Sequence, residues 1–299
     1  MRKNVKKIAV TALSLVMLGS VLTGCGGNGT EGSSEGGSST SENKGNAAIT
    51  VVSREDGSGT RGAFTELLGI AVDDVDNTVD TAEITNSTSV MMTTVAGDEN
   101  AIGYISLGSL NDSVKALKVD GVEATVENVK SGTYKVARPF EICTPKSGVS
   151  EVAQDFIDFL LSDEGQAVIN EEGYISVESG KTYEASDKEG KVTLAGSTSV
   201  SPVMEKLTEK YKELNPNVTF EIQQTGSSAG IESATNGACD IGMSSRELKD
   251  TELENLDEIQ IAMDGICVIV NNNSTVEDLT SEQIKQVYVG EITEWGELN

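Results

Sequence analysis

Short apolar runs rich in β-branched residues alternate along the chain with longer stretches in which apolar residues recur every three or four positions. Five short runs predict strands: Ile49–Ser53, Ala101–Ser106, Val192–Ala195, Val218–Gln223 and Ile266–Val270. Two longer stretches have helical spacing, with apolar faces at Val203, Leu207, Tyr211 and Leu214, and at Val152, Phe156, Phe159 and Leu160. The alternation predicts an α/β protein with open mixed sheets flanked by helices.

Local signals mark where some of these elements begin and end. Pro202 suits the first turn of a helix. Thr280 and Gln283 form a capping box, which predicts a helix through Tyr288 that stops at Gly290. The polar segment Lys181–Gly190 is typical of a surface connection.

Three predicted strands end in loops of glycine and hydroxyl residues that run directly into a predicted helix. The loops are Arg54–Thr60, Gly196–Ser199 and Thr225–Gly230. Such loops offer backbone N–H groups and hydroxyls at a helix N-terminus, where oxyanions bind, and glycine permits close approach. One such loop is an ordinary helix cap. Three of them, one carrying an arginine that can hold an oxyanion through two N–H groups, predict an oxyanion site.

Composition excludes several other functions. Gly226–Gly230 fits the G-x-S-x-G pattern of serine hydrolases, but the 299 residues include no histidine to activate the serine. The missing histidine also excludes imidazole metal sites. A net charge of −26 argues against nucleic-acid binding. It does not exclude an anionic ligand, because helix N-termini and one arginine act locally while distant charges are screened.

The N-terminus predicts export and anchoring. Residues 1–24 have a basic start and an apolar run, as in a signal peptide. Leu22–Cys25 resembles a lipobox, which predicts lipidation of Cys25; an ordinary secretory signal is the alternative. Residues 25–47 are rich in Gly, Ser and Glu and predict a flexible tether. Without residues 1–24 the chain keeps 18 basic and 48 acidic residues, a charge of −30.

Three cysteines remain in the body of the chain. Cys143, Cys239 and Cys267 each lie in an apolar context, which predicts buried thiols. The sequence also allows a disulfide between two of them but does not require one.

Several segments together resemble one family. Four carry most of the resemblance: Ser53–Phe64, Ala195–Pro202, Thr225–Gly230 and Asp240–Leu248. They are similar to the phosphate-binding lipoproteins of bacterial phosphate ABC transporters, as are Ala101–Ser106 and Leu279–Trp295, so the resemblance covers residues 48–299. It implies a two-lobed periplasmic-binding-protein fold with a ligand cleft between the lobes and no catalysis, metal or cofactor. It also implies a lipid anchor on the extracytoplasmic face of the cell membrane, with a permease and an ATPase as partners.

The same resemblance implies the residues that bind phosphate. Residue by residue, the site falls on Arg54, Ser58, Gly59, Thr60, Thr198, Ser199, Ser227 and Ser245. Asp56 falls where the family has a carboxylate that orients the arginine. Many family members have aspartate where this chain has Ser245, so selectivity stays open between phosphate and sulfate or molybdate. A sensor or a surface adhesin on the same fold is a further alternative.

The order of the segments differs from the usual family order. Here Ser53–Phe64 comes first and the chain ends just after Trp295, which indicates a circular permutation with Lys181–Gly190 joining the ordinary ends. Lobe A would then comprise residues 48–140 and 270–299, and lobe B residues 141–269. A truncated tandem gene or a domain-swapped pair is the alternative.

Overall fold

The computed structural model describes residues 47–73 and 75–298. The predicted signal peptide, Cys25 and all but the last residue of the predicted tether lie outside the described residues. Within the described ranges, no helix is both long enough and apolar enough to cross a membrane.

The described elements alternate between strand and helix, as the sequence predicts. The strands are β1 (Thr50–Arg54), β2 (Ala71–Val72), β3 (Val75–Asp76), β4 (Glu83–Thr85), β5 (Ala101–Ser106), β6 (Lys115–Ala116), β7 (Lys118–Val119), β8 (Ala137–Pro145), β9 (Ile175–Ser176), β10 (Gly190–Gly196), β11 (Val218–Gln224), β12 (Ile241–Ser244), β13 (Leu256–Val270) and β14 (Asp278–Leu279). The helices are α1 (Gly59–Leu67), α2 (Thr88–Gly97), α3 (Val126–Lys130), α4 (Glu151–Leu160), α5 (Asp163–Glu171), α6 (Ser201–Leu214), α7 (Ser227–Thr235), α8 (Asp250–Leu253) and α9 (Ser281–Tyr288), with 3₁₀ turns η2 (Leu107–Ser109) and η3 (Trp295–Leu298).

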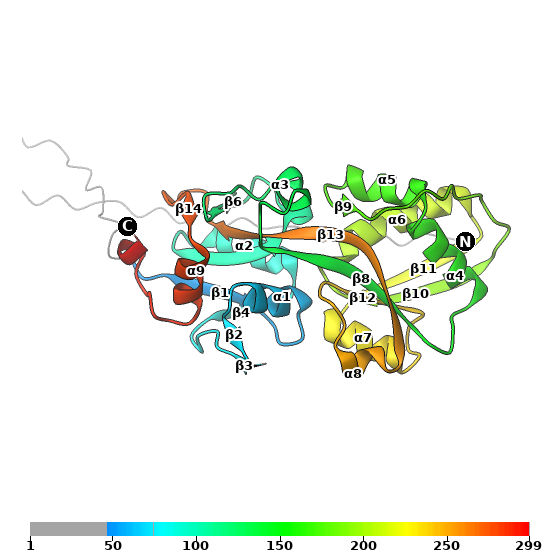
Figure 1. Ribbon diagram of the computed structural model, residues 1–299, viewed down its shortest axis with the longest axis horizontal. Coiled ribbons are helices and arrows are strands. Elements are labelled where there is room, and N and C mark those ends of the chain that lie inside the picture. The colour runs from blue at the N-terminus through cyan, green and yellow to red at the C-terminus, as the bar shows by residue number, and fades with distance from the viewer. Residues whose placement is uncertain (1–46, 74, 299) are drawn as a thin grey trace, which may run out of the picture. The chain divides into compact units, whose positions relative to one another are not determined.

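The main sheet consists of two groups of parallel strands joined by two long antiparallel strands. The strand order is β11-β10-β12-β8-β13-β5-β1-β4, and β6 and β9 also pair with β13. β11, β10 and β12 are parallel and form the β10 group, while β5, β1 and β4 are parallel and form the β1 group. β8 and β13 are antiparallel to each other and connect the two groups (Figure 1). The α/β class with mixed sheets is confirmed.

Strand β13 runs through both groups. Its first part, Leu256–Gly265, pairs with β8, and its last part, Ile266–Val270, pairs with β5. The sequence predicted only the last part, because Asp257, Glu258 and Gln260 interrupt the apolar run of the first. β8 and β12 were not among the predicted strands.

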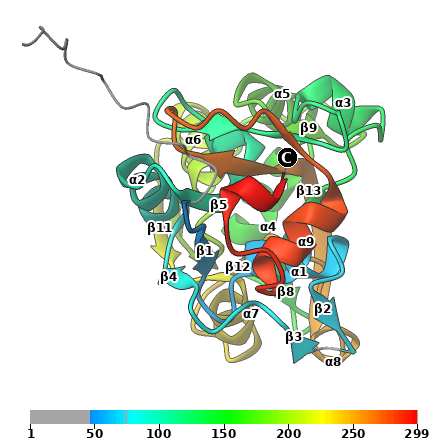
Figure 2. The same ribbon diagram turned by 90° about the vertical axis from the view of Figure 1, so that its left-hand side faces the viewer.

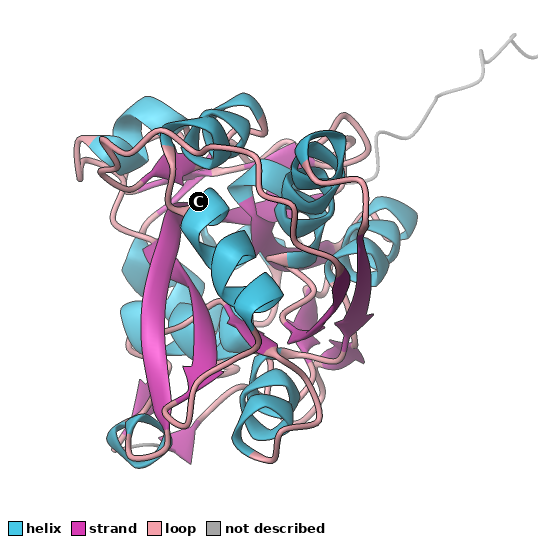
Figure 3. Ribbon diagram, turned by 90° about the vertical axis from the view of Figure 1, so that its right-hand side faces the viewer, coloured by secondary structure: helices cyan, strands magenta, loops and turns pink. Residues whose placement is uncertain are grey.

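The predicted helices and their ends are confirmed. α4 and α6 bury their predicted apolar faces in one cluster with strands of the β10 group. α9 begins with the predicted capping box, in which Thr280 Oγ1 accepts from the Gln283 N–H at 3.1 Å and Gln283 Oε1 accepts from the Thr280 N–H at 2.9 Å. Figure 3 shows helices around the strands on the side of the β10 group.

In the β1 group, successive residues of a strand pack against helices on opposite faces of the sheet. Val51 packs in a cluster with Phe64 of α1 and residues of α9, while the next residue, Val52, packs with Met91 of α2. Figure 2 shows α2 on one side of β1 and β5, with α1 and α9 on the other. This alternation is the two-residue period of a strand that is buried on both faces.

Two smaller predictions are also confirmed. Cys143, Cys239 and Cys267 are buried free thiols, and burial raises the pKa of Cys143 to about 12. Segment Lys181–Gly190 has no buried residue and connects β9 to β10.

Candidate anion-binding site

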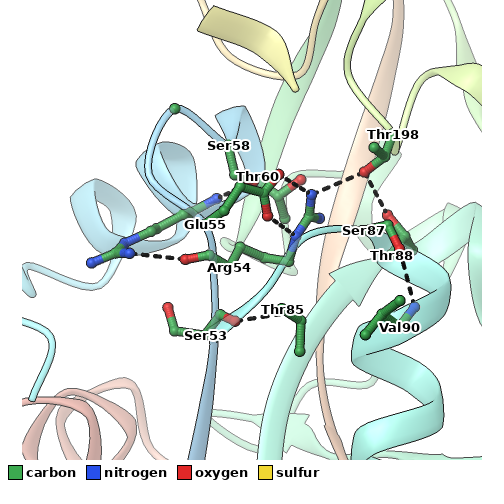
Figure 4. A network of polar contacts seen from close by, with 12 residues as sticks. Ser53, Arg54, Glu55, Ser58, Thr60, Thr85, Ser87, Thr88, Val90 and Thr198 are labelled. Carbon is green, nitrogen blue, oxygen red and sulfur yellow. Dashed lines mark hydrogen bonds and ion pairs between the residues drawn. The ribbon is translucent and has the colours of Figure 1, made fainter. Parts of the chain in front are cut away.

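The carboxyl ends of five strands converge, two from the β1 group and three from the β10 group, and each is followed by residues with hydroxyl groups. β1 leads into α1, β4 into α2, β10 into α6, β11 into α7, and β12 ends at Ser244 next to Ser245. Hydrogen bonds connect the loops of the β1 group with those of the β10 group (Figure 4). In open α/β sheets, ligands bind at such strand ends.

Arg54 is the last residue of β1 and is 2% exposed. Its Nη2 donates to Thr198 Oγ1 at 2.9 Å. Its backbone is held as well, since the N–H donates to the Tyr104 hydroxyl at 3.1 Å and the carbonyl accepts from Arg61 Nη1 at 2.8 Å. Burial raises the pKa of Tyr104 to about 12, so this hydroxyl stays neutral at physiological pH. Arg54 is therefore a fixed cation beneath the loops.

The carboxylate that orients Arg54 belongs to Glu55, so the assignment of this role to Asp56 is wrong. Arg54 Nε donates to Glu55 Oε2 at 2.8 Å, and Nη2 donates to Glu55 Oε1 at 2.9 Å. The chain turns directly after Glu55, with Gly57 at a φ of +81°, and this turn leaves Asp56 exposed. Among residues 47–73 and 75–298, the one hydrogen bond of the Asp56 side chain is the one that Oδ1 accepts from the neighbouring Gly57 N–H, at 3.0 Å. Figure 4 shows Arg54 between Glu55 and Thr198.

The start of α1 contributes three of the predicted residues. Ser58 is the N-cap and its Oγ accepts from the Arg61 N–H at 3.4 Å. Gly59 and Thr60 follow in the first turn, whose N–H groups have no acceptor within the helix. A Cβ on Gly59 would lie 2.4 Å from Ser227 Oγ and 2.7 Å from Ser245 Oγ. Glycine is required here because the helix end touches these two serines.

Hydroxyl groups from both strand groups form a chain of contacts beside Arg54. Thr60 Oγ1 lies 2.9 Å from Ser199 Oγ, which lies 3.2 Å from Thr88 Oγ1. Thr88 Oγ1 is also 3.5 Å from Thr198 Oγ1. On the other side, Ser227 Oγ and Ser245 Oγ are 3.3 Å apart. All of these residues are buried.

The sequence prediction missed Thr88. It opens α2 directly after the short strand β4, so this is a fourth strand–loop–helix unit. β4 has only three residues and its loop contains no glycine, so neither signal used for the other units was present. The run of polar and hydroxyl residues at 86–89 could have indicated it.

The sequence prediction also missed a buried ion pair beside the hydroxyls. Arg138 of β8 and Asp264 of β13 are each 1% exposed, with Nη2 and Oδ2 3.0 Å apart. Burial raises the pKa of Asp264 and lowers that of Arg138, and attraction between the charges opposes both shifts. Arg138 Nη1 donates to Thr60 Oγ1 and to the Ser245 carbonyl, both at 2.9 Å. No local sequence pattern indicates this ion pair, because its two residues are 126 positions apart in the sequence.

The groups behind the hydroxyls fix their direction. Thr60 Oγ1 accepts from Arg138, Thr198 Oγ1 accepts from Arg54, and Ser227 Oγ accepts from the Ser245 N–H at 3.1 Å. Guanidinium and backbone N–H groups can only donate, so each of these hydroxyls is left with its own proton to donate. The site is therefore rich in oriented donors, which is the arrangement that suits an oxyanion.

Comparison with known proteins gives relatives over nearly the whole chain. A family model described as a PBP superfamily domain matches residues 2–164 and 181–298. Phosphate-binding protein PstS 2 of Streptococcus agalactiae serotype V (strain ATCC BAA-611 / 2603 V/R) is 48% identical over 303 residues, covering 99% of each chain.

Two further comparisons bear on structure and segment order. The crystal structure of a phosphate ABC transporter phosphate-binding protein from Streptococcus pneumoniae TIGR4 is 45% identical, with a TM-score of 0.68, and covers 85% of this chain and 100% of that one. The phosphate-binding protein PstS of Staphylococcus saprophyticus is 36% identical over 128 residues, which is 40% of each chain.

Proposed function

The chain belongs to the PstS family of phosphate-binding proteins within the PBP superfamily, and on that premise we propose that it captures inorganic phosphate and delivers it to an ABC transporter. The resemblance found in the sequence is thereby confirmed, and the fold is the expected periplasmic-binding-protein fold. The partners are the permease and ATPase of that transporter. The bound species is inorganic phosphate, and the protein carries it without chemical change.

One observation carries the assignment of the site. The buried guanidinium of Arg54 lies against Thr198, within a layer of hydroxyls drawn from both strand groups. Phosphate binds in this layer, held by Arg54, the Ser58–Thr60 turn, Thr198, Ser199, Ser227 and Ser245, with Thr88 added to the predicted set. A hydrogen bond to a charged group contributes about 1.5–3 kcal/mol, so a few such donors give tight binding. Burial from water strengthens each of them.

The proposed function includes two lobes that close on the anion, and the division of the core supports this arrangement. One large apolar cluster contains Phe140 and Ile261, and the other contains Val136 and Ile266. The clusters therefore change over within β8 and β13, the two strands that connect the groups. The proposed lobe A, 48–140 with 270–299, and lobe B, 141–269, would then meet at these strands. The change of cluster in β13 lies before residue 266, a few residues ahead of the proposed boundary.

Circular permutation is part of the proposal, and the coverage of the relatives supports it. The Ile49 N–H donates to the Thr293 carbonyl at 2.8 Å, and the Trp295 N–H donates to the Ala47 carbonyl at 3.0 Å. Residues near the two ends of the described chain are thus adjacent, which is common in domains and which the proposed permutation also requires. The streptococcal relative matches over its full length, whereas the staphylococcal one matches over 40%, as expected when only one of two exchanged blocks can align in order.

Anchoring follows from the N-terminal sequence. Cleavage before Cys25 and its lipidation would hold the protein on the extracytoplasmic face of the cell membrane, with residues 26–47 as tether. The binding unit would then stay near its permease.

Calorimetry with phosphate, sulfate and molybdate on the processed chain (residues 25–299) tests this function. We expect one phosphate per chain. Ser245 provides a hydroxyl acceptor for the proton of hydrogen phosphate but no charge to repel sulfate. The preference for phosphate over sulfate should therefore be about 2- to 12-fold, the worth of one neutral hydrogen bond at ~0.5–1.5 kcal/mol. No heat with phosphate, or equal affinity for sulfate, would contradict the proposal.

A further inference from the structure

Arg138 joins the two halves of the hydroxyl layer from the connecting strand β8. Its Nη1 donates to Thr60 Oγ1 of α1 and to the backbone carbonyl of Ser245, the residue directly after β12. One nitrogen thereby bridges a residue of the β1 group and a residue of the β10 group. The guanidinium is 1% exposed, so solvent does not compete for these bonds.

We propose that Arg138 is a positioning residue for anion binding, which turns the Thr60 hydroxyl toward the ligand and couples closure of the site to the connecting strands. The inference rests on the proposed function, because it concerns the same site. Arg138 acts through Thr60 and Ser245 and need not touch the anion itself.

The direction of the Thr60 hydroxyl follows from the chemistry of arginine. A guanidinium carries only donors, so the bond at 2.9 Å makes Thr60 Oγ1 an acceptor. The Thr60 proton must then be donated away from Arg138, toward Ser199 or the anion. Hydrogen bonds in a chain polarise one another. The Thr60 hydroxyl, which accepts from Arg138, is therefore also a stronger donor.

Asp264 binds Nε and Nη2 of the Arg138 guanidinium, which leaves Nη1 to donate to Thr60 and to the Ser245 carbonyl. Its Oδ2 accepts from Nε at 3.3 Å and from Nη2 at 3.0 Å, and its Oδ1 accepts from Ser106 Oγ at 3.0 Å. The carboxylate balances the charge of Arg138. Arg138 therefore contributes direction and geometry to the site, whereas Arg54, which is paired with Glu55, is the arginine proposed to contact the anion.

A double-mutant cycle between Arg138 and Thr60 tests the proposal, with phosphate affinity of the processed chain as the readout. Arg138→Lys keeps the charge beside Asp264, but a single ammonium replaces three nitrogens and cannot hold the same directions. We expect Arg138→Lys to weaken phosphate binding about 10-fold when Thr60 is present. In a Thr60→Val background the same change should cost less than about 3-fold, since the two residues act as one unit.

The matched control is Tyr134→Phe. Tyr134 is also buried, and its hydroxyl donates to the Ile266 carbonyl of β13 at 2.8 Å, away from the hydroxyl layer. This variant should lower the melting temperature and leave phosphate affinity within about 2-fold of the original, as expected for independent sites.

The outcomes separate the two proposals. If the unaltered chain does not bind phosphate, the proposed function fails. If it binds but the Arg138 change costs the same in both backgrounds, the positioning role fails while the function stands. Should Arg138→Lys not fold, the cycle is run with Arg138→Gln and Asp264→Asn together, which removes both buried charges, and it is judged by the same criterion.

Discussion

Replacement of Gly59 by alanine should weaken phosphate binding without lowering the stability of the phosphate-free protein. The added Cβ would lie 2.4 Å from Ser227 Oγ and 2.7 Å from Ser245 Oγ, closer than non-bonded atoms approach. Gly59 belongs to α1 and the two serines follow strands of the β10 group. The overlap therefore arises between the two parts of the molecule that the proposed opening of the lobes would separate.

The size of the effect follows from the cost of overpacking. An extra methyl group forced into a packed contact costs about 1–3 kcal/mol, which is roughly 5- to 150-fold in affinity. Under the proposed closure, only the closed form would carry this cost. Phosphate affinity should then fall by that factor, while the melting temperature without phosphate, which the proposal assigns to an open form, should change by no more than about 2 °C.

Gly62→Ala is the matched control, because it adds the same atom one turn further along the same helix. There the Cβ would meet Arg246 Cδ at 3.6 Å, an ordinary contact. Calorimetric titration with phosphate gives the affinities and thermal unfolding gives the stabilities. Gly62→Ala should bind phosphate as the original chain does.

Two results would refute this reasoning. Unchanged affinity in Gly59→Ala would mean that phosphate binds without contact between Gly59 and the two serines. An affinity loss matched by an equal loss of stability without ligand would mean that the contact belongs to the fold and not to closure.

Three further predictions concern charge and anchoring. Arg54→Ala should weaken phosphate binding 10-fold or more, by calorimetry, because about 1.5–3 kcal/mol is lost with each bond to the anion. Burial, with Glu258 nearby, raises the pKa of Glu141 to about 8. The unfolding free energy should therefore fall as pH rises from about 4.5 to 8, and Glu141→Gln should flatten this slope in urea titrations; an unchanged slope would show that Glu141 is not responsible. Cys25→Ala should release the protein into the medium, whereas continued retention in the membrane fraction would exclude Cys25 as the anchor.

Residues close together in sequence were predictable, and long-range partners were not. The loops at Arg54, Gly196 and Thr225 are recognisable because strand, glycine, hydroxyl and helix follow one another within a dozen positions. Arg138 is different, since its role depends on the pairing of β8 with β13 and on a partner 126 residues away.

The error at Asp56 has a local physical cause. Asp56 and Glu55 are adjacent carboxylates, and only the turn at Gly57 decides which of them faces Arg54. The sequence contains that glycine but does not give the direction in which the turn sends each side chain. Resemblance to the family placed the role one residue away from where the structure has it.

A crystal structure of the processed chain with phosphate is the most direct test of the central claim. We predict a single phosphate within hydrogen-bond distance of the Arg54 guanidinium and of the hydroxyls of Thr198, Ser199 and Ser227, enclosed by Gly59–Thr60 and Ser245. Phosphate bound at another place would contradict the account. So would phosphate bound here while the Arg54 guanidinium stays hydrogen-bonded to Thr198 and lies beyond hydrogen-bond distance of the phosphate.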